Sequence, residues 1–505
     1  MMGALGRQRL GTRPTSQRVP VPAPYGGMNT RDSLDSMSPT DAVSLRNWDC
    51  DVGKVRMRKG RSSHATGVGT ANVDSMVEYH AASVRKLIAS ANGKVYDATS
   101  AGAATQLGTG YSADAWEWAN FNGKLLGVNG ADTPLEYDGT TLSNSTLSGS
   151  GLTPANLDGI AVHKGRVYRW DSGTQDFWYS SANAVAGTVV KFPLSRVSQF
   201  GGNLTAMISW TVDAGVGGAD DFLVAIMSSG DCIVYSGSDP GDASNFSLVG
   251  IYRIGAPIDK RAMLKLGGDV LIATNEDYVS LSDVLRKGRL TTDRSKMSGA
   301  LVAAYKAYKS NAGWGAVHYP RGNRVLFNIP VSATLYDQHV LNTITGAWTV
   351  YGEIPARSWV VFNDLLYLGS TDGTIYKADD TNADAGATIK ADGQPAWSQL
   401  GYPGRKRVVG VRPVLASEGS LTASIGLGYD YAGPGTAQTI ATTAGGTAWG
   451  SAWGSPWSPA TRAKGEWRGA IGEGQDVAFR LQITTSGQEV EWHETTYLYE
   501  PGQRL

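Results

Sequence analysis

Short hairpin signals recur through most of the chain, and their spacing constrains the fold more than any other feature. Asn-Gly and Asp-Gly pairs between short apolar runs supply the positive φ angles of two-residue turns, as at Asn92-Gly93, Asn122-Gly123 and Asp138-Gly139. Between residues 73 and 380 the strand–turn–strand pattern returns at intervals of roughly forty residues, the period of a propeller blade. We therefore predict a mainly β fold with a β-propeller of about seven blades, with six or eight as alternatives.

One segment inside this region has a different periodicity. In residues 294–311, Leu301, Tyr305 and Tyr308 have helical spacing, and a serine precedes them as a candidate N-cap. We therefore expect one helix inserted between two blades.

The spacing of apolar residues changes after a polar linker over residues 379–394. Longer segments then alternate apolar and polar residues, as strands with one buried face do; they cover residues 405–416, 420–431, 477–486 and 489–499. We therefore predict a propeller over residues 66–385, followed by a C-terminal β-sandwich-like platform domain over residues 386–505.

The first 65 residues differ from the rest in charge and in proline content. Residues 1–31 contain five arginines, four prolines and no acidic residue. Such a composition favours an extended basic arm that orders on binding a partner. Ser38, Pro39 and Asp41 then suit the start of a short helix within residues 36–49, and a strand is expected within residues 55–61.

Overall composition narrows the classes of function. The 45 Lys and Arg residues balance the 45 Asp and Glu residues, whereas a protein that grips nucleic acid usually carries a basic excess. Cys50 and Cys232 are too few and too far apart for a disulfide framework or a zinc cluster. No apolar run approaches the length of a membrane span, and no secretory signal is visible at the N-terminus.

A search for catalytic motifs returns none of the common ones. The sequence has no G-x-S-x-G, no H-E-x-x-H and no phosphate-binding G-x-x-x-x-G-K-[ST] motif, and its six histidines are scattered. Asp380, Asn382 and Asp384 alternate as calcium ligands would, but Ala385 and Ala391 stand where such a loop needs Gly and Glu. We therefore expect a protein that is not an enzyme and has no cofactor or metal.

Tryptophan is concentrated in two places. Trp116 and Trp118 lie two residues apart, so on a strand they share a face, and buried packing between blades is the favoured interpretation. Trp449, Trp453 and Trp457 recur every four residues, but the glycines and proline between them exclude a helix. These three are expected to pack within the C-terminal domain or against a neighbouring subunit, with a sugar-binding platform as the alternative.

Positive charge is concentrated in the N-terminal arm and in a second cluster, Arg405, Lys406, Arg407 and Arg412. Such residues neutralise phosphates without reading sequence. The alternatives are a solvated face or docking onto an acidic neighbour.

Several segments resemble one known family. Residues 24–60 combine Gly26-Gly27-Met28-Asn29, an Asn47-Trp48 pair and a strand with Gly53, Arg58 and Gly60. This combination resembles the opening of the tail nozzle, or tail-hub, proteins of short-tailed bacteriophages, which include packaged-DNA stabilisation-like proteins. "YSGSDPGDASNF" (235–246), "NTITGAWTVY" (342–351) and the tryptophan segment are similar to later parts of the same family.

The resemblance implies a structural virion protein, made in the bacterial cytoplasm and located in the tail. It would form a homohexameric ring below the head-to-tail adaptor, continue and close the DNA exit channel, and attach fibres or a needle. Duplex DNA would slide through without sequence-specific binding. The implied interface residues are Arg7, Arg9, Arg13, Arg18, Arg405, Lys406, Arg407, Trp449, Trp453 and Trp457.

A propeller that binds or cleaves surface polysaccharide is the alternative function. A glycosidase would need two carboxylates facing each other across a cleft, and no sequence feature nominates such a pair.

Overall fold

The computed structural model describes residues 15–213, 219–287, 294–417, 421–434, 438–442 and 467–502. The chain divides into two compact units. Residues 58–387 form the propeller unit, and residues up to 57 together with those from 388 onward form the sandwich unit. In sequence, the propeller is therefore an insertion into the sandwich, with boundaries at 57/58 and 387/388 in place of the expected 65/66 and 385/386.

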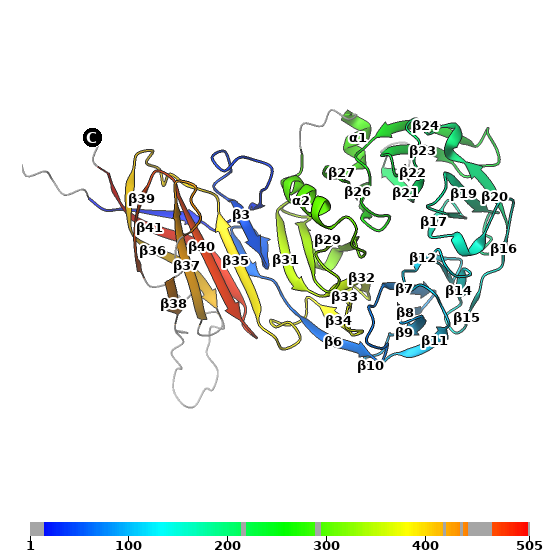
Figure 1. Ribbon diagram of the computed structural model, residues 1–505, viewed down its shortest axis with the longest axis horizontal. Coiled ribbons are helices and arrows are strands. Elements are labelled where there is room, and N and C mark those ends of the chain that lie inside the picture. The colour runs from blue at the N-terminus through cyan, green and yellow to red at the C-terminus, as the bar shows by residue number, and fades with distance from the viewer. Residues whose placement is uncertain are drawn as a thin grey trace, which may run out of the picture. The chain divides into compact units, whose positions relative to one another are not determined.

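The propeller unit is a closed ring of antiparallel sheets (Figure 1). In the described ranges, six sheets have the four or more strands of a complete blade, and a three-stranded sheet lies between two of them. The prediction of a mainly β fold with a propeller is confirmed.

In every propeller sheet except the last, the strands follow one another along the chain. The first two blades contain β7 (Ser75–Ala81), β8 (Val84–Ala91), β9 (Lys94–Asp97) and β11 (Thr105–Thr109), then β12 (Glu117–Phe121), β13 (Lys124–Val128), β14 (Leu135–Tyr137) and β15 (Leu142–Asn144). The next two contain β17 (Gly159–His163), β18 (Arg166–Trp170), β19 (Asp176–Ser180) and β20 (Gly187–Pro193) with β16 (Leu147–Ser148), then β21 (Leu204–Asp213), β22 (Ala219–Met227), β23 (Asp231–Gly237) and β24 (Phe246–Arg253). The three-stranded sheet contains β25 (Met263–Leu266), β26 (Asp269–Ala273) and β27 (Tyr278–Ser280). The last two blades contain β28 (Gly315–Tyr319), β29 (Arg324–Pro330), β30 (Tyr336–Asn342) and β31 (Trp348–Ile354), then β32 (Ala356–Phe362), β33 (Leu365–Ser370) and β34 (Ile375–Ala378) with β6 (Arg61–Thr66) and β10 (Gly102–Ala103).

The predicted hairpin turns have the backbone that their residues allow. Asn92 and Gly93 take φ angles of 56° and 69°, and Asn122 and Gly123 take 47° and 72°, as a two-residue turn with both central residues at positive φ requires. At Asp138 the turn is longer. Its carboxylate accepts the backbone N–H groups of Thr140 and Thr141 at 2.8 and 2.7 Å, which is how an Asp side chain stabilises a loop locally.

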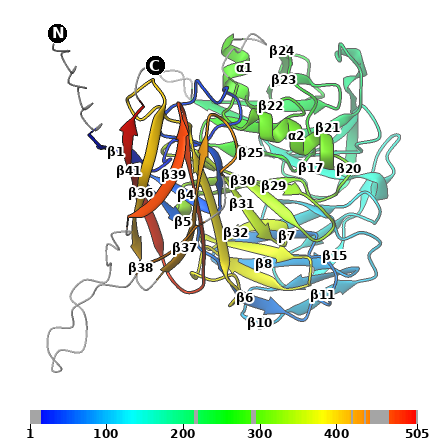
Figure 2. The ribbon, with the colours of Figure 1, turned by 60° about the vertical axis from the view of Figure 1, so that its left-hand side comes forward.

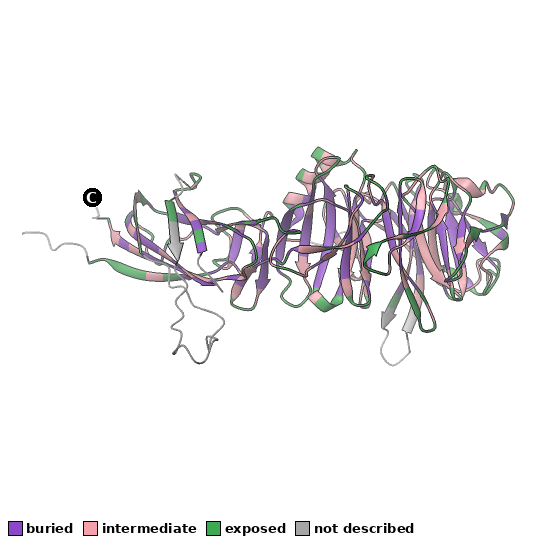
Figure 3. Ribbon diagram, turned by 90° about the horizontal axis from the view of Figure 1, so that it is seen from below, coloured by how far each residue is buried: buried purple, intermediate pink, exposed green. Residues whose placement is uncertain are grey.

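Large apolar side chains fill the space between neighbouring blades. Tyr168 and Phe177 from one blade pack in the same cluster as Leu223 and Ile233 from the next. Buried residues follow the strands, while exposed residues gather in the connecting loops (Figure 3). This arrangement explains the repeat, because a blade has two apolar faces and buries them only against neighbours.

The ring closes with a strand that precedes the first blade. Strand β6 pairs antiparallel with β34, so residues more than 300 positions apart share the last blade. One segment of chain thus joins the two ends of the unit, and closure makes every blade depend on both neighbours.

In the described part of the propeller unit, two α-helices accompany the sheets. Helix α2 (Ser298–Tyr308) lies inside the segment predicted to be helical, so this prediction is confirmed. Helix α1 (Leu281–Lys287) was not predicted and directly follows β27. Its Leu281 and Val284 pack with Val270 and Ile272 of β26, so the helix covers the three-stranded sheet. No helix in the described ranges is long and apolar enough to cross a membrane.

The sandwich unit has two sheets built from both ends of the chain (Figure 2). The first runs β39 (Arg468–Gly474), β36 (Lys406–Ser417), β41 (Val490–Pro501), β5 (Lys54–Met57) and β4 (Trp48–Asp51), with β1 (Gln17–Pro22) also paired to β41. The second runs β3 (Asp41–Arg46), β35 (Ile389–Pro395), β40 (Val477–Thr485), β37 (Leu421–Tyr429) and β38 (Gln438–Thr442), with β2 (Gly27–Met28) beside β3. The β-sandwich-like domain is confirmed, and the N-terminal residues contribute strands to it.

Aromatic rings fill the core between these sheets. Trp48 and Trp492 are fully buried with centroids 5.9 Å apart, and Phe479 lies 5.8 Å from Trp492. A Cβ atom on Gly393 would come within 3.0 Å of Trp492 and 3.2 Å of Trp48. The lack of a side chain at Gly393 therefore makes room for both indoles.

The prediction of a helix within residues 36–49 is wrong, because this segment forms strands β3 and β4. Asn47 separates the strands with φ of 60°, and its Nδ2 donates to the carbonyl oxygen of Lys390 at 2.7 Å. Leu45 and Trp48 on either side are buried. Burial in the sandwich thus outweighs the local signals for a helix start, as tertiary packing commonly does.

The N-terminal arm is described from residue 15. Residues Gln17–Pro22 form β1 along β41, with Arg18 opposite Leu498 and Pro20 opposite Thr496. This part of the arm is therefore extended, as predicted, but it belongs to a sheet. Residues 1–14 lie outside the described ranges.

Candidate functional site

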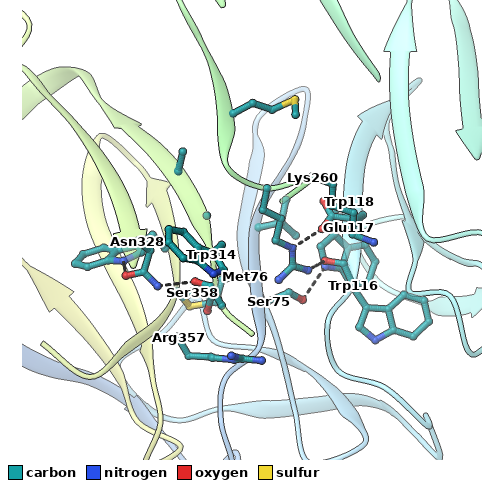
Figure 4. Close-up of a pocket in the computed structure, with 17 residues that line it drawn as sticks. Ser75, Met76, Trp116, Glu117, Trp118, Lys260, Trp314, Asn328, Arg357 and Ser358 are labelled. Atoms are coloured by element: carbon teal, nitrogen blue, oxygen red, sulfur yellow. Dashed lines mark hydrogen bonds and ion pairs between the residues drawn. The ribbon is translucent and has the colours of Figure 1, made fainter. Parts of the chain in front are cut away.

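A cavity of about 290 Å³ lies in the propeller unit, where the first strands of several sheets meet. Strands β7, β12, β25, β28 and β32 all contribute to its wall. Figure 4 shows Glu117, Trp118, Trp314 and Arg357 around this space. It combines aromatic and charged side chains in a hollow, so it is the first place to look for binding or chemistry.

Arg261 links blades that are distant in sequence. It lies in the connection between β24 and β25, and its guanidinium is ion-paired with Glu117 of β12. Its Nη2 donates to the carbonyl oxygen of Trp116 at 2.7 Å, and its Nη1 donates to that of Asp74 at 2.9 Å. Burial is the largest single influence and lowers the pKa of Arg261, but Glu117, Asp259 and Asp74 all raise it, and the net shift is upward. The guanidinium therefore stays charged and ties this connection to the first two blades.

The residues just before Arg261 make further contacts between blades. Nζ of Lys260 donates to the carbonyl oxygen of Asp158 at 2.5 Å and to its carboxylate at 3.1 Å. Asp158 precedes β17, so Lys260 reaches the third blade. The carboxylate of Asp259 accepts the backbone N–H of Arg261 at 2.9 Å, and burial raises the pKa of Asp259. Residues 259–261 thus join three blades across the ring.

The opposite side of the cavity is also cross-linked. Arg357 of β32 is ion-paired with Asp74 and donates to the Tyr336 hydroxyl at 3.2 Å. Oδ1 of Asn328 accepts from Trp359 Nε1 at 3.1 Å and from Gln338 Nε2 at 2.9 Å. Its Nδ2 donates to two backbone carbonyl oxygens at 2.8 and 2.9 Å. Asn328 therefore uses both of its donors and both lone pairs within the protein.

These contacts limit the chemistry available in the cavity. Its two nearby carboxylates, Glu117 and Asp74, are each engaged by an arginine. In the part of the chain that the structure describes, no three His, Cys, Asp or Glu side chains gather as a metal site would require. The arrangement holds the blades together, and sequence reasoning missed it, since Arg261 and Glu117 are 144 residues apart.

The paired tryptophans of this region pack as predicted. Trp116 and Trp118 stack with ring centroids 5.5 Å apart, and Trp116 is 1% exposed. Nε1 of Trp118 donates to Ser75 Oγ at 3.3 Å. A Cβ atom on Gly127 would lie 2.3 Å from the Trp118 ring, so glycine is needed beneath it.

A buried ion pair joins the two ends of the propeller unit. Arg58 donates to Asp384 through Nη1 at 3.0 Å and Nη2 at 2.6 Å, and the two residues are 3% and 7% exposed. Arg61 lies 3.4 Å from the same carboxylate. A Cβ atom on Gly60 would lie 2.1 Å from the carbonyl oxygen of Ala383. Arg58, Gly60 and Asp384 together form what we call the clasp.

The clasp also accounts for the linker considered as a calcium loop. Asp384 forms ion pairs with two arginines. Asp380 forms an ion pair with Lys377 at 2.7 Å and accepts a hydrogen bond from Ser62 Oγ at 2.5 Å. Both carboxylates therefore bind partners from the protein itself, which favours the linker interpretation.

The interface residues implied by the resemblance fall into three groups: residues outside the described ranges, exposed residues and one buried residue. Arg7, Arg9, Arg13, Trp449, Trp453 and Trp457 lie outside the described residues. Arg405 and Arg407 are exposed, but Lys406 is 1% exposed and donates to the carbonyl oxygen of Gln475. Burial lowers the pKa of Lys406. The expectation that Lys406 belongs to an exposed cluster is wrong, because its strand turns that side chain inward.

Arg407 is also less free than the sequence suggested. In the register of its sheet it lies opposite Glu473 on one side and Glu500 on the other. Cross-strand neighbours of opposite charge reduce the local positive potential. Of the run Arg405, Lys406 and Arg407, the two arginines are therefore exposed, and one of them lies between two glutamates.

A different basic site forms instead from strands β1 and β36 and the residue that precedes β39. Trp467 is 41% exposed, and the guanidinium carbons of Arg18 and Arg412 lie 6.0 and 5.2 Å from its ring centroid. These distances suit cation–π contacts. Sequence reasoning named Arg18 and Arg412 but missed Trp467, because only strand pairing brings the three together.

Comparisons with known proteins give limited help. No family model matches the chain, and no curated protein matches it. Among solved structures, it is similar to the extracellular domain of a one-component system, BT4673, from B. thetaiotaomicron, with 8% identity and a TM-score of 0.43 over 86% of this chain and 64% of that one. It is also similar to Chaetomium thermophilum Raptor, with 11% identity and a TM-score of 0.39 over 64% of this chain and 29% of that one. The chain thus spans less than two thirds of either structure, and similarity at this level carries no functional information.

Proposed function

We propose that the protein is a structural component of a virion that forms the ring-shaped nozzle of a short phage tail. It would continue and close the DNA exit channel below the head-to-tail adaptor and give fibres or a needle a place to attach. In this role it is not an enzyme and needs no cofactor. Duplex DNA passes its ring without sequence-specific contacts.

The position of the motif residues carries this proposal. Asn47 forms the turn between two strands, and Trp48 lies in the sandwich core. Arg58 and Gly60 form one side of the clasp. The residues on which the resemblance depends are thus residues that this fold needs, which is what a shared architecture predicts.

The size of the cavity limits where a DNA channel could lie in such a nozzle. A space of about 290 Å³ crossed by Arg261 and Arg357 is far too small for duplex DNA, whose major groove alone is about 12 Å wide. A DNA channel must therefore lie between several copies of the chain and not along the axis of one propeller.

Electron microscopy and native mass spectrometry of the purified full chain test the proposal. We expect rings of six copies around a lumen wide enough for duplex DNA. Single particles at every concentration, with no ring when the adaptor is added, would contradict it.

The alternative is a propeller that binds or cleaves surface polysaccharide. The observation in its favour is that Trp118, Trp314 and Trp359 line the cavity, and sugars stack on such rings. A glycan-binding screen separates the two functions: a nozzle shows no saturable binding, whereas a sugar-binding propeller loses binding when the half-buried Trp118 is changed to alanine.

A further inference from the structure

Within its described residues, the sandwich unit has two exposed large aromatic side chains, Tyr431 and Trp467, in surroundings of opposite charge. Trp467 is 41% exposed between Arg18 and Arg412; we call these three residues the basic patch. Tyr431 is 42% exposed beside Asp35, Asp430 and Asp476; we call these four residues the acidic patch. Exposed aromatic side chains flanked by charge are typical of interfaces.

Strand register places the basic patch on the outer face of its sheet. Arg18 and Gly410 both lie opposite Leu498 of β41, so the three residues form a row across the sheet. The neighbouring Tyr497 and Tyr499 point to the other face and are buried. A Cβ atom on Gly410 would lie 3.3 Å from the Trp467 ring. The indole therefore rests on this glycine with an arginine on either side.

The acidic patch belongs to a different part of the sandwich unit, beyond the end of β37. Asp430 and Tyr431 both have positive φ, 48° and 64°, which is costly for residues other than glycine. Oδ1 of Asp430 holds the turn by accepting the N–H groups of Gln475 and Asp476 at 2.6 and 3.1 Å. Burial and then the charges of Asp476, Asp35 and Asp430 raise the pKa of Tyr431. The tyrosine thus projects from a strained turn in a negative field.

The charged side chains of both patches form no ion pairs in the described ranges, although the charges of Asp476 and Asp430 act on the ammonium of Lys406, which is 1% exposed and donates to the carbonyl oxygen of Gln475. Arg18 and Arg412 have no ion-pair partner there, and neither do Asp35, Asp430 and Asp476. The chain as a whole has a formal net charge of zero, so copies do not repel one another. Each patch is therefore the complement of the other in charge, and each offers one exposed aromatic ring.

We propose that the basic patch of one copy docks on the acidic patch of the next copy of this chain. The two surfaces differ, so the contact is head-to-tail, and head-to-tail contacts build rings when the rotation closes. This inference rests on the proposed function and deepens it by naming the sandwich unit as the part that assembles. Nucleic acid is the competing occupant, but phosphates would use only the basic patch and would leave the acidic patch without a role.

Charge reversal tests the contact in the full chain. One variant carries Arg18→Glu with Arg412→Glu, and the other carries Asp35→Lys with Asp476→Lys. Each variant alone places like charges at every junction, so we expect the concentration for half-assembly to rise at least about tenfold. An equimolar mixture places opposite charges at every junction and should assemble again, in alternating order, as measured by native mass spectrometry with one variant isotope-labelled.

Controls keep the result interpretable. Lys306→Glu with Lys309→Glu changes the net charge as the arginine variant does, at exposed residues in and just after α2 of the propeller unit, and should leave assembly unchanged. Arg412 is half-buried, so Arg18→Glu alone, at an exposed position, serves if the double variant fails to fold. The thermal transition of each variant reports folding.

The outcomes separate this inference from the proposed function. Rings that persist in both charge variants would overturn the inference and leave the nozzle proposal standing. Loss of DNA retention in the Arg18 variant, with assembly intact, would assign the basic patch to phosphates and also overturn it. Assembly through the patches into filaments without a lumen would support the contact but contradict the nozzle. A wild-type chain that stays monomeric at every concentration, with and without the adaptor, would overturn both.

Discussion

The two units of this protein reach similar antiparallel sheets by opposite routes. In the propeller unit most strands pair with the next strand along the chain, across turns such as Asn122-Gly123. In the sandwich unit, β1 pairs with β41, and Arg18 finds its neighbour Leu498 almost 500 residues away. The difference teaches that local turn chemistry specifies one unit, whereas burial of distant segments specifies the other.

The largest expected effect tests the dependence of the sandwich on distant segments. Trp492→Ala removes a fully buried indole that contacts Trp48 and Phe479, and such truncations cost about 3–5 kcal/mol. We expect the unfolding transition of the sandwich unit to fall while that of the propeller unit stays, as measured by calorimetry. Val52→Ala, at a residue that is 77% exposed, is the control. A shift of both transitions together would contradict the division into units.

The clasp makes closure of the propeller unit depend on residues that are distant in sequence, as strand pairing in the sandwich unit does. Asp384→Ala would remove the carboxylate that pairs with the buried guanidinium of Arg58, and breaking a buried ion pair in this way costs about 3–5 kcal/mol. Replacing both partners, as Arg58→Met with Asp384→Leu, should recover most of this loss. The free energy of unfolding of the propeller unit, obtained by denaturant titration, measures the loss in the single variant and the recovery in the double variant. A single variant as stable as the wild type would show that β6 and β34 close the ring without the ion pair.

A buried histidine should make the stability of the propeller unit depend on pH. His339 is 5% exposed, its Nδ1 lies 2.8 Å from the Tyr278 hydroxyl, and burial lowers its pKa to about 4. In the unfolded chain the histidine pKa has its ordinary value of about 6.5. The contribution of His339 to the free energy of unfolding is therefore fully present above pH 6.5 and is lost as pH falls towards 4. The loss amounts to about 3 kcal/mol.

Thermal unfolding of the propeller unit, recorded at a series of pH values between 7 and 4, measures this loss. His339→Gln removes this titrating group and should make the dependence of the propeller unit shallower. A remainder is expected from His163 and His318, because burial lowers their pKa values too. Identical pH profiles for the variant and the wild type would contradict the assignment to His339.

The smallest expected effect concerns a single local turn. Gly123→Ala keeps a φ of 72°, and the added Cβ would meet only the Cβ of Ala81 at 3.9 Å. The cost is therefore conformational and about 1 kcal/mol. Gly469→Ala, at an open position without positive φ in the sandwich unit, is the control and should change stability by a few tenths of a kcal/mol. A loss as large as that at Trp492 would show that single turns govern the propeller.

Prediction from sequence succeeded where neighbouring residues decide the structure. The hairpins, the propeller and helix α2 follow from turn residues and apolar spacing within short windows. It failed for residues 36–49, where Ser38 and Pro39 suit a helix start but Leu45 and Trp48 are drawn into a sandwich core. It failed again at Lys406, because the direction of a side chain on a strand depends on which face the sheet buries.

The candidate sites were harder to predict than the fold. Arg261 and Glu117, Arg58 and Asp384, and Arg18 and Trp467 are partners separated by 144, 326 and more than 400 residues. No pattern of spacing connects such pairs, because each contact arises only when a ring closes or a strand adds to a sheet.

The sequence by itself determined the β-rich class, the repeating hairpins and the absence of common catalytic motifs, since these depend on residue type and local spacing. The resemblance to tail nozzle proteins also came from short motifs. Tertiary structure alone decided that both ends of the chain share one sandwich and that the clasp closes the ring. It also formed the basic patch around Trp467, because strand pairing is set by buried area and register over the whole chain.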